Sequence, residues 1–276
     1  MTKILVTTDF STNSKAGIRF AMQLASQIPC ELVFYHAFEQ LAPTAWSREG
    51  ANTFTENAIN NCKDLLVRFL NKMFKPMKLP VSNYKYDVEM GLDVDHLIIN
   101  YAKKINADFI CMSTRGAGTL KKLIGTNASK LVNESPIPVI VVPQRYRIQS
   151  ITKVAYSTDL ENFEEEIKIV EKLAASLKAQ VHVYHYYYPL HEMEIKQTYE
   201  MVQQKHASKN IVFHSPRLHI EYALAENLQH LIKKEKPSIL VMFTKLKHNW
   251  FERFFLSNNT AEMTYDINVP LWAFRK

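Results

Sequence analysis

Three of the chain's six glycines, Gly116, Gly118 and Gly125, lie between a predicted strand and a predicted helix near the middle of the sequence. The preceding run Phe109–Ser113 is short and apolar, which is typical of a buried parallel strand. Glycines at such a junction let backbone N–H groups approach a phosphate closely. The segment lacks the Gly-Lys-Ser/Thr ending of a P-loop and the spacing of a dinucleotide fingerprint. It therefore predicts a phosphate site of another kind.

Polar residues from other strand ends are expected to meet this glycine segment. In a doubly wound sheet, ligands bind beyond the carboxyl ends of the strands, where the strand order reverses. Asp9 follows the first predicted strand and can accept hydrogen bonds from a ribose or a base, or it can cap a turn instead. Thr126 and Asn127 can present hydroxyl, amide and backbone N–H groups to phosphate oxygens. The stretches that converge are Thr8–Ser11, His36–Phe38, Met112–Gly118 and Gly125–Ala128.

The chain repeats itself once along its length. Lys3–Asp9 returns as Lys153–Asp159, and the closing run Ile137–Val142 returns as Val269–Phe274. A period of one whole domain indicates tandem duplication rather than a solenoid.

The second copy loses the glycines while it keeps the aspartate. Leu246 stands where Gly116 was and Ser257 where Gly125 was, whereas Asp159 matches Asp9. A leucine requires a different backbone or blocks close approach, so we expect no nucleotide in the second copy.

Alternating strands and helices predict an α/β fold of two repeated doubly wound domains, residues 1–144 and 150–276, each with a five-stranded parallel sheet flanked by helices. We expect the two domains to pack as a pseudo-dimer through their closing strands. A helix is predicted at about Asn52–Phe74, and the third strand of the second half at about Leu218–Tyr222. The expected helix caps are Ser14 in the first half and a capping box of Asn162 and Glu165 in the second.

Bulk composition excludes other classes of protein. The chain has 276 residues, 47% hydrophobic and 22% charged, which suits two ordinary globular cores. Its net charge of +7 is spread through the predicted helices, so we expect no specific nucleic-acid binding. We expect no membrane span and no signal peptide. The three cysteines show no paired spacing, which indicates reduced thiols and a cytoplasmic protein.

The opening Ile4–Ser11 and the stretch from Met112 through Pro143 resemble the universal stress protein family, and the likeness covers nearly the whole chain as a tandem pair. In nucleotide-binding members the signature is Gly-x-x-Gly, nine residues, then Gly-Ser/Thr. The resemblance implies ATP or AMP as ligand, with Mg²⁺, and places Asp9 and Ala37 near adenine and ribose. The nucleotide-binding residues expected in total are Thr8, Asp9, Ala37, Met112, Ser113, Arg115, Gly116, Gly118, Gly125, Thr126, Asn127 and Ala128.

Two departures from the family signature concern the same loop. Ser113 occupies the first glycine position, and eight residues rather than nine separate Gly116 from Gly125. The side chain of Ser113 either crowds a ligand or contacts it through its hydroxyl.

We therefore expect a cytoplasmic stress-response protein whose first domain binds ATP or AMP as a regulatory switch. No general base stands beside a candidate nucleophile, which favours a binding protein over an enzyme, with ATP hydrolysis slow or absent. One alternative is a nucleotide-free scaffold for a protein or a small hydrophobic ligand. The other is a weak ATPase with Asp9 as its metal-binding carboxylate. The expected partners are the nucleotide, the internal pseudo-dimer and a homodimer. His182 and His185 fall on opposite faces of a strand, so we predict no zinc site.

Overall fold

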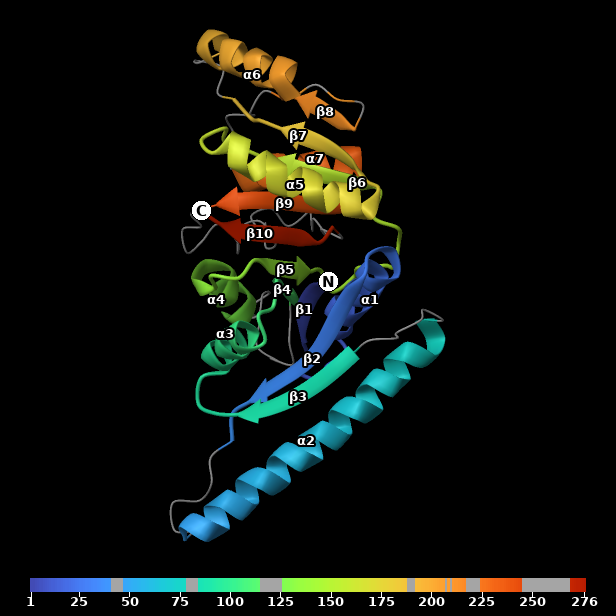
Figure 1. Cartoon of the computed structure of the whole chain (residues 1–276), viewed down its shortest axis with the longest axis vertical. Helices are drawn as coiled ribbons and strands as arrows, with labels where there is room; N and C mark the ends of the chain where they lie inside the picture. The colour runs from blue at the N-terminus through green and yellow to red at the C-terminus, as the bar shows by residue number, and fades with distance from the viewer. Residues whose placement is uncertain are drawn as a thin grey trace, which may run out of the picture. The chain divides into compact units, whose positions relative to one another are not determined.

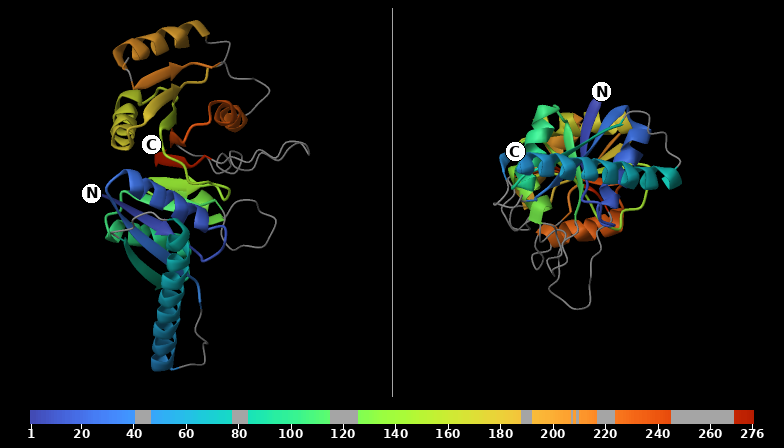
Figure 2. Two further views of the ribbon diagram at one scale, coloured as in Figure 1. Left: turned by 90° about the vertical axis from the view of Figure 1, so that its right-hand side faces the viewer. Right: turned by 90° about the horizontal axis from the view of Figure 1, so that it is seen from below.

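The chain forms two compact α/β units, residues 1–148 (unit 1) and 149–276 (unit 2). Figures 1 and 2 show the elements of both in a computed structural model. The structure describes residues 1–40, 47–77, 84–114, 126–187, 192–206, 208, 210–216, 224–244 and 269–276.

Unit 1 is a doubly wound sheet. Its strands lie in the order β3-β2-β1-β4-β5, and every neighbouring pair is parallel. Helices α1 and α2 cover one face of the sheet and α3 and α4 the other (Figure 1), as right-handed crossovers require. The elements along the chain are β1 (Thr2–Thr7), α1 (Lys15–Gln27), β2 (Cys30–Phe38), α2 (Arg48–Met77), β3 (Tyr84–Met90), α3 (Val94–Lys104), β4 (Phe109–Ser113), α4 (Thr126–Glu134) and β5 (Val139–Val142).

Unit 2 repeats this topology. Its strands lie in the order β10-β9-β6-β7-β8, again with parallel neighbours. The two five-stranded parallel sheets confirm the predicted fold class, while the predicted pairing of the closing strands stays a prediction. The elements are β6 (Lys153–Ser157), α5 (Phe163–Leu177), β7 (Gln180–Tyr184), α6 (Glu192–His206), β8 (Ile211–His214), α7 (Leu224–Glu235), β9 (Ile239–Thr244) and β10 (Leu271–Arg275).

The sequence-based prediction placed the third strand of unit 2 at the wrong residues. The strand that pairs with β7 is Ile211–His214, with Val181 opposite Ile211. The predicted segment Leu218–Tyr222 lies outside the described residues. It alternates apolar and polar residues like a half-buried strand, whereas β8 has only four residues, too few to show a period.

Helix α2 is longer than predicted at both ends and runs for 30 residues. Only Leu66, Leu70 and Met73 of its described side chains are buried. The amino-terminal part of α2 therefore extends past the edge of the unit 1 sheet, as Figure 2 shows. The apolar spacing predicted only the part of the helix that packs on the sheet.

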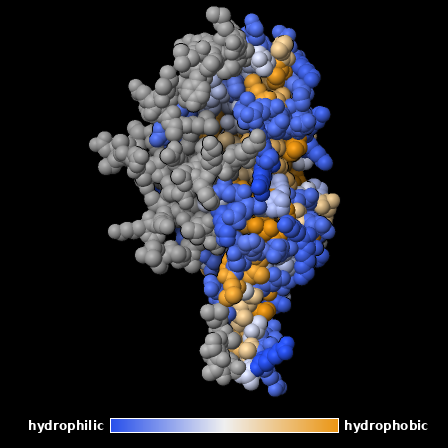
Figure 3. Space-filling model, turned by 90° about the vertical axis from the view of Figure 1, so that its left-hand side faces the viewer, coloured by the Kyte–Doolittle hydropathy of each residue, from blue (hydrophilic) through white to orange (hydrophobic). Residues whose placement is uncertain are grey.

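Apolar side chains also reach the surface of the described part of the chain. On the face drawn in Figure 3, hydrophobic residues lie in separate groups among hydrophilic ones. This is ordinary for a folded protein, in which much of the surface is apolar. The large apolar residues that are exposed are Met1, Leu65, Tyr84, Tyr86, Leu92, Ile148, Ile169 and Met201.

Candidate functional site

The candidate site lies at the carboxyl ends of β1 and β4, which are neighbours in the unit 1 sheet. The register pairs Val6 of β1 with Cys111 of β4. The chain leaves β1 toward β2 on one side, whereas β4 lies on the other side, so the strand order reverses here. This is the position at which open α/β sheets bind ligands. Thr8 and Ser113, two of the predicted site residues, come at the ends of these two strands.

The hydroxyl group of Ser113, at the end of β4, caps the start of helix α1. Its oxygen accepts a 2.8 Å hydrogen bond from the backbone N–H of Gly17 and donates to the carbonyl of Ser14 at 3.1 Å. Ser14 occupies the N-cap position but makes no side-chain cap of its own, so the predicted Ser14 cap is wrong. Both Ser113 contacts are buried. The hydroxyl at the family's glycine position therefore contacts α1.

Gly17 permits this approach between α1 and β4. A methyl group at Gly17 would lie 3.2 Å from the carbonyl carbon of Met112 and 3.3 Å from the nitrogen and hydroxyl of Ser113. These separations are tighter than most side-chain contacts, so a larger residue here would require its neighbours to shift by a few tenths of an ångström.

The Ser14 hydroxyl serves the turn that precedes α1 instead. It donates to the Ser11 carbonyl at 2.9 Å and lies 2.8 Å from the hydroxyl of Thr8. Thr8 in turn accepts from the backbone N–H of Phe10 at 3.2 Å. A chain of hydroxyl groups thus joins the end of β1 to the start of α1.

Asp9 has a structural contact in this turn. Its carboxylate accepts a 3.1 Å hydrogen bond from the backbone N–H of Ser11. Phe10 between them has a φ of 63°, a left-handed conformation that a non-glycine residue adopts only when its surroundings hold it. The turn-capping interpretation of Asp9 is therefore supported, and a ligand contact by the same carboxylate stays a prediction.

His36 lies in one of the stretches predicted to converge on the site, but it was assigned no role from the sequence. Its Nδ1–H donates to the carbonyl of Thr8 at 2.8 Å, and its ring contacts those of Phe10 and Phe38, with centroid distances of 4.2 and 5.5 Å. Burial lowers the pKa of His36, against the opposing effects of the Thr8 carbonyl and the Asp9 charge. The neutral imidazole of His36 thus links the end of β2 to the end of β1 through a hydrogen bond.

The same constellation recurs in unit 2. The Thr158 hydroxyl accepts from Leu160 N–H at 3.0 Å, and Asp159 accepts from Glu161 N–H at 3.1 Å. Leu160 has a φ of 69°, and His185 Nδ1–H donates to the Thr158 carbonyl at 3.1 Å. Burial lowers the pKa of His185 as it does that of His36. The recurrence of Thr, Asp and His at matching positions of the two sequence repeats is the signal that predicts this recurring arrangement.

Unit 2 differs in what contacts its aspartate. Lys276 Nζ lies 2.6 and 2.7 Å from the two carboxylate oxygens of Asp159 and 3.3 Å from Glu166. The Lys276 side chain is 4% exposed and that of Glu166 5%. Tyr156 donates its hydroxyl to the other Glu166 oxygen at 2.5 Å. Burial alone would lower the pKa of Lys276, but Asp159 and Glu166 outweigh it and raise that pKa. The buried ammonium group of Lys276 therefore forms an ion pair with Asp159.

The predicted capping box before α5 does not form. Asn162 takes the N-cap position, but its side chain makes no cap hydrogen bond. Glu165 N–H donates to the Asn162 carbonyl at 3.2 Å instead.

The remaining predicted residues fall into two groups. Ala37 is half-buried near the end of β2, whereas Met112 on β4 and Ala128 in the first turn of α4 are buried. Thr126 and Asn127 open helix α4, and only their backbone is described. Arg115, Gly116, Gly118 and Gly125 lie outside the described residues.

In the described part of the chain, no group of three or more His, Cys, Asp or Glu side chains is arranged to hold a metal ion. None of the helices described is both long and apolar enough to cross a bilayer.

The model of the universal stress protein family matches residues 1–143. The chain belongs to the universal stress protein family. "Universal stress protein A homolog 1" of Coxiella burnetii (strain RSA 493 / Nine Mile phase I) is 27% identical over 139 residues, which are 50% of this chain and 94% of that protein.

A solved universal stress protein shares the fold of the complete chain. The crystal structure of a universal stress protein from Archaeoglobus fulgidus DSM 4304 has a TM-score of 0.68 at 12% identity, and the match covers 99% of this chain and 98% of that one. At this identity the likeness shows the fold alone. The resemblance read from the strand-end residues is confirmed at the level of the family and its architecture.

Proposed function

We propose that unit 1 binds an adenine nucleotide, ATP or AMP, at the carboxyl ends of β1 and β4, and that the bound nucleotide regulates the protein in a stress response. The observation that carries this proposal is that Thr8 and Ser113 lie next to each other where the strand order reverses. Both hydrogen-bond to Ser14, in the turn that precedes α1. Helix α4 starts at Thr126, directly after the glycines of the sequence. Backbone N–H groups at a helix start attract phosphate.

Each end of the nucleotide has a proposed set of residues. Asp9 and Ala37, at the ends of β1 and β2, are assigned to the nucleoside. Thr126, Asn127 and the glycines are assigned to the phosphates. The described residues offer no metal site of their own, so Mg²⁺ would enter with the phosphates of ATP.

The proposal gives one nucleotide per chain. In unit 2, Asp159 is already bonded to Lys276 through both carboxylate oxygens, and Leu246 replaces the loop glycine. A ligand would have to displace a buried ammonium from two carboxylates, which is costly.

In this proposal the nucleotide regulates the protein by stabilising its folded state on binding, not by being hydrolysed. A ligand that binds only the folded state stabilises it by RT ln(1 + [L]/Kd), about 2.7 kcal/mol at a hundredfold excess over Kd. We also propose a cytoplasmic location, because Cys30, Cys62 and Cys111 are all free thiols.

Isothermal titration with ATP, AMP and adenosine, with and without Mg²⁺, tests this function. We expect saturable binding at one site per chain, lost in Gly116→Leu, which copies the second half. Leu246→Gly is the matched control and should leave binding unchanged. Asp9→Asn keeps an acceptor for the turn but removes the charge, so weaker binding in this variant with an unchanged melting temperature would assign Asp9 to the ligand.

Other outcomes would replace the proposal. If no nucleotide binds, the scaffold function takes its place. If ATP is consumed in a steady-state phosphate-release assay and Asp9→Asn abolishes turnover, the protein is a weak ATPase rather than a switch.

A further inference from the structure

The ammonium group of Lys276 lies among three carboxylates at the carboxyl end of the unit 2 sheet. Its Nζ atom is 2.6 and 2.7 Å from the two carboxylate oxygens of Asp159, 3.3 Å from Glu166 and 3.8 Å from Glu161. Tyr156, which is fully buried, donates its hydroxyl to the other oxygen of Glu166. We call Asp159, Glu161 and Glu166 the carboxylate cluster. Its occupant in this structure is a primary ammonium on an alkyl chain.

Lys276 reaches the cluster from a strand that is not a neighbour of β6. It follows β10, and the strand order β10-β9-β6 places β9 between β10 and the end of β6 that precedes Asp159. The lysine side chain therefore crosses the carboxyl end of β9. It ends where the strand order of unit 2 reverses, which is where open α/β sheets bind ligands. The lysine thus occupies the ligand position of its own unit.

The charges of this position belong to unit 2 alone. Apart from the aspartate, unit 1 has an uncharged residue at each matching position of the sequence repeat. The matching pairs are Val6 and Tyr156, Ser11 and Glu161, Ala16 and Glu166, and Gln144 and Lys276. Decay of a nucleotide site accounts for a lost glycine, but it does not account for two added carboxylates and a lysine. Unit 2 therefore has a binding chemistry of its own.

The carboxylate cluster has an exposed rim and a buried floor. The side chains of Asp159 and Glu161 are 52% and 62% exposed, whereas that of Glu166 is 5% exposed. Within the described part of the chain, Oε1 of Glu166 accepts no hydrogen bond, although it faces the ammonium at 3.3 Å. An unbonded oxygen on a buried carboxylate is costly. Lys276 therefore leaves one acceptor of the site unsatisfied, and the exposed rim gives a ligand from solvent a way in.

We propose that the carboxylate cluster is a binding site for primary alkylammonium ions and that Lys276 keeps it closed by filling it from within the chain. A primary ammonium suits the site because it has three N–H donors, which match carboxylate oxygens on several sides. Its alkyl chain follows the path of the lysine side chain. A quaternary ammonium has no N–H to donate, and an anion would be repelled. The contact of Lys276 is thus autoinhibitory, and this inference does not depend on the nucleotide proposed for unit 1.

Lys276→Gly opens the site for a test, because n-butylamine has the four carbons and the nitrogen that the variant lacks. Butylammonium chloride should raise the melting temperature of this variant saturably, beyond the effect of NaCl at equal ionic strength. The native chain, whose site is filled, should show no rise beyond that of salt. n-Butanol and tetramethylammonium chloride should not stabilise the variant, because the first has no charge and the second has no N–H. If Lys276→Gly is unfolded in NaCl, recovery of its far-UV circular dichroism in butylammonium chloride supports the proposal equally.

Two further variants separate the site from general effects of the amine. Lys276→Met also lacks the ammonium but keeps a side chain in the site, so butylammonium should not stabilise it beyond NaCl. Adding Glu166→Gln to Lys276→Gly should weaken butylammonium roughly tenfold or more, since a hydrogen bond to a buried charge is lost.

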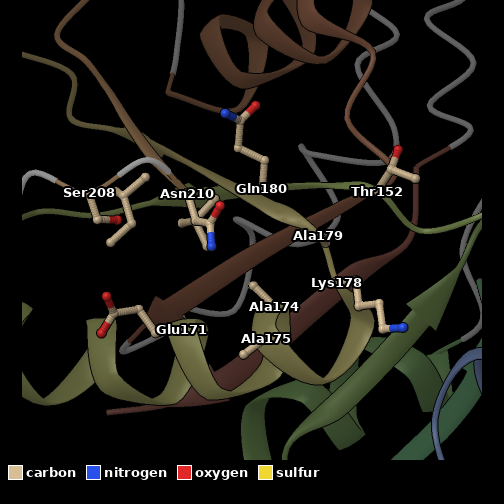
Figure 4. A pocket seen from close by; sticks show the side chains of 11 residues that line it. Thr152, Glu171, Ala174, Ala175, Lys178, Ala179, Gln180, Ser208 and Asn210 are labelled. Carbon is tan, nitrogen blue, oxygen red and sulfur yellow. The ribbon is translucent and has the colours of Figure 1, made fainter.

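Another acidic surface of unit 2 supplies the matched control. Figure 4 shows a cavity of about 650 Å³ between α5 and the starts of β7 and β8, which Glu171 lines at the opposite ends of the strands. Adding Glu171→Gln to Lys276→Gly should leave the affinity for butylammonium unchanged. The proposal is overturned if butylammonium does not stabilise Lys276→Gly, or if it stabilises the native chain or Lys276→Met to the same extent, whatever the result with ATP.

Discussion

Ser113 at the end of β4 accepts the backbone N–H of Gly17, the third residue of α1, at 2.8 Å. This bond is normally made by the N-cap side chain of the helix itself. Here the bond crosses from one element to another, because the Ser14 hydroxyl is engaged by Thr8 and Ser11. The strand that carries the glycine signature and the helix that starts beside the candidate site are thereby fixed to each other.

Replacing Ser113 by alanine should lower the free energy of unfolding by about 1–2 kcal/mol, the range for a lost cap with a buried amide left unbonded. Urea denaturation measures this change. Ser26→Ala, which removes an exposed hydroxyl of the same helix bonded to the Gln23 carbonyl, is the control and should have a smaller effect. A loss no larger than that of the control would show that the Ser113 bond contributes nothing.

Gly17→Ala should destabilise unit 1, although alanine has the higher helix propensity by about 1 kcal/mol. The added methyl group would lie 3.2 Å from the backbone of Met112, so β4 and α1 would have to separate. We expect a net loss of about 1–2 kcal/mol, as for other overpacked sites. Thermal denaturation tests the sign, and a stabilised variant would mean that the two elements yield easily.

Lys276→Met should destabilise unit 2 by about 3 kcal/mol, because removal of one partner leaves a buried charge without its counter-ion. Glu166 is the residue affected most, since its side chain is 5% exposed. Adding Glu166→Gln to Lys276→Met should recover part of the loss. Arg275→Met, at the neighbouring exposed position, is the control. Equal denaturation midpoints for the two single variants would show that the ammonium is not needed.

Stability should fall as the pH drops from about 6.5 toward 4, in part because of a histidine pair in unit 2. The ring nitrogens of His182 and His214 are 3.0 Å apart. Burial, with the charges of Lys153 and His214, lowers the pKa of His182 to about 4. Burial also lowers the pKa of His214, although the nearby Glu235 charge acts to raise it. Since the unfolded histidines bind protons near pH 6.5, acid favours the unfolded state over this interval.

His182→Gln should flatten this pH dependence, measured as the urea midpoint at pH 7.5, 5.5 and 4.5. His96→Gln, which removes an exposed histidine of unit 1, is the control and should retain the native slope. If both variants keep the native slope, the His182–His214 pair does not cause the pH dependence.

Much of the fold was determined by the sequence itself. Apolar runs bounded by turns predicted β4 and β5 without error, and the repeat of Lys3–Asp9 as Lys153–Asp159 predicted two like units. These signals are local, because a strand buried on both faces must be apolar throughout whatever surrounds it. Where the strand was short, as in β8, the pattern was too brief and the prediction was wrong.

The contacts at the site were decided only by the tertiary structure. Ser14 and Asn162 have the residue types of helix caps, and both occupy N-cap positions, yet neither makes the side-chain bond. Which hydroxyl caps a helix depends on which donors and acceptors lie within 3 Å, and Ser113 reaches Gly17 from 96 residues away in the chain. Lys276 and Asp159 meet for the same reason. The sequence determined what groups were available at the strand ends, and packing decided which of them bond to one another.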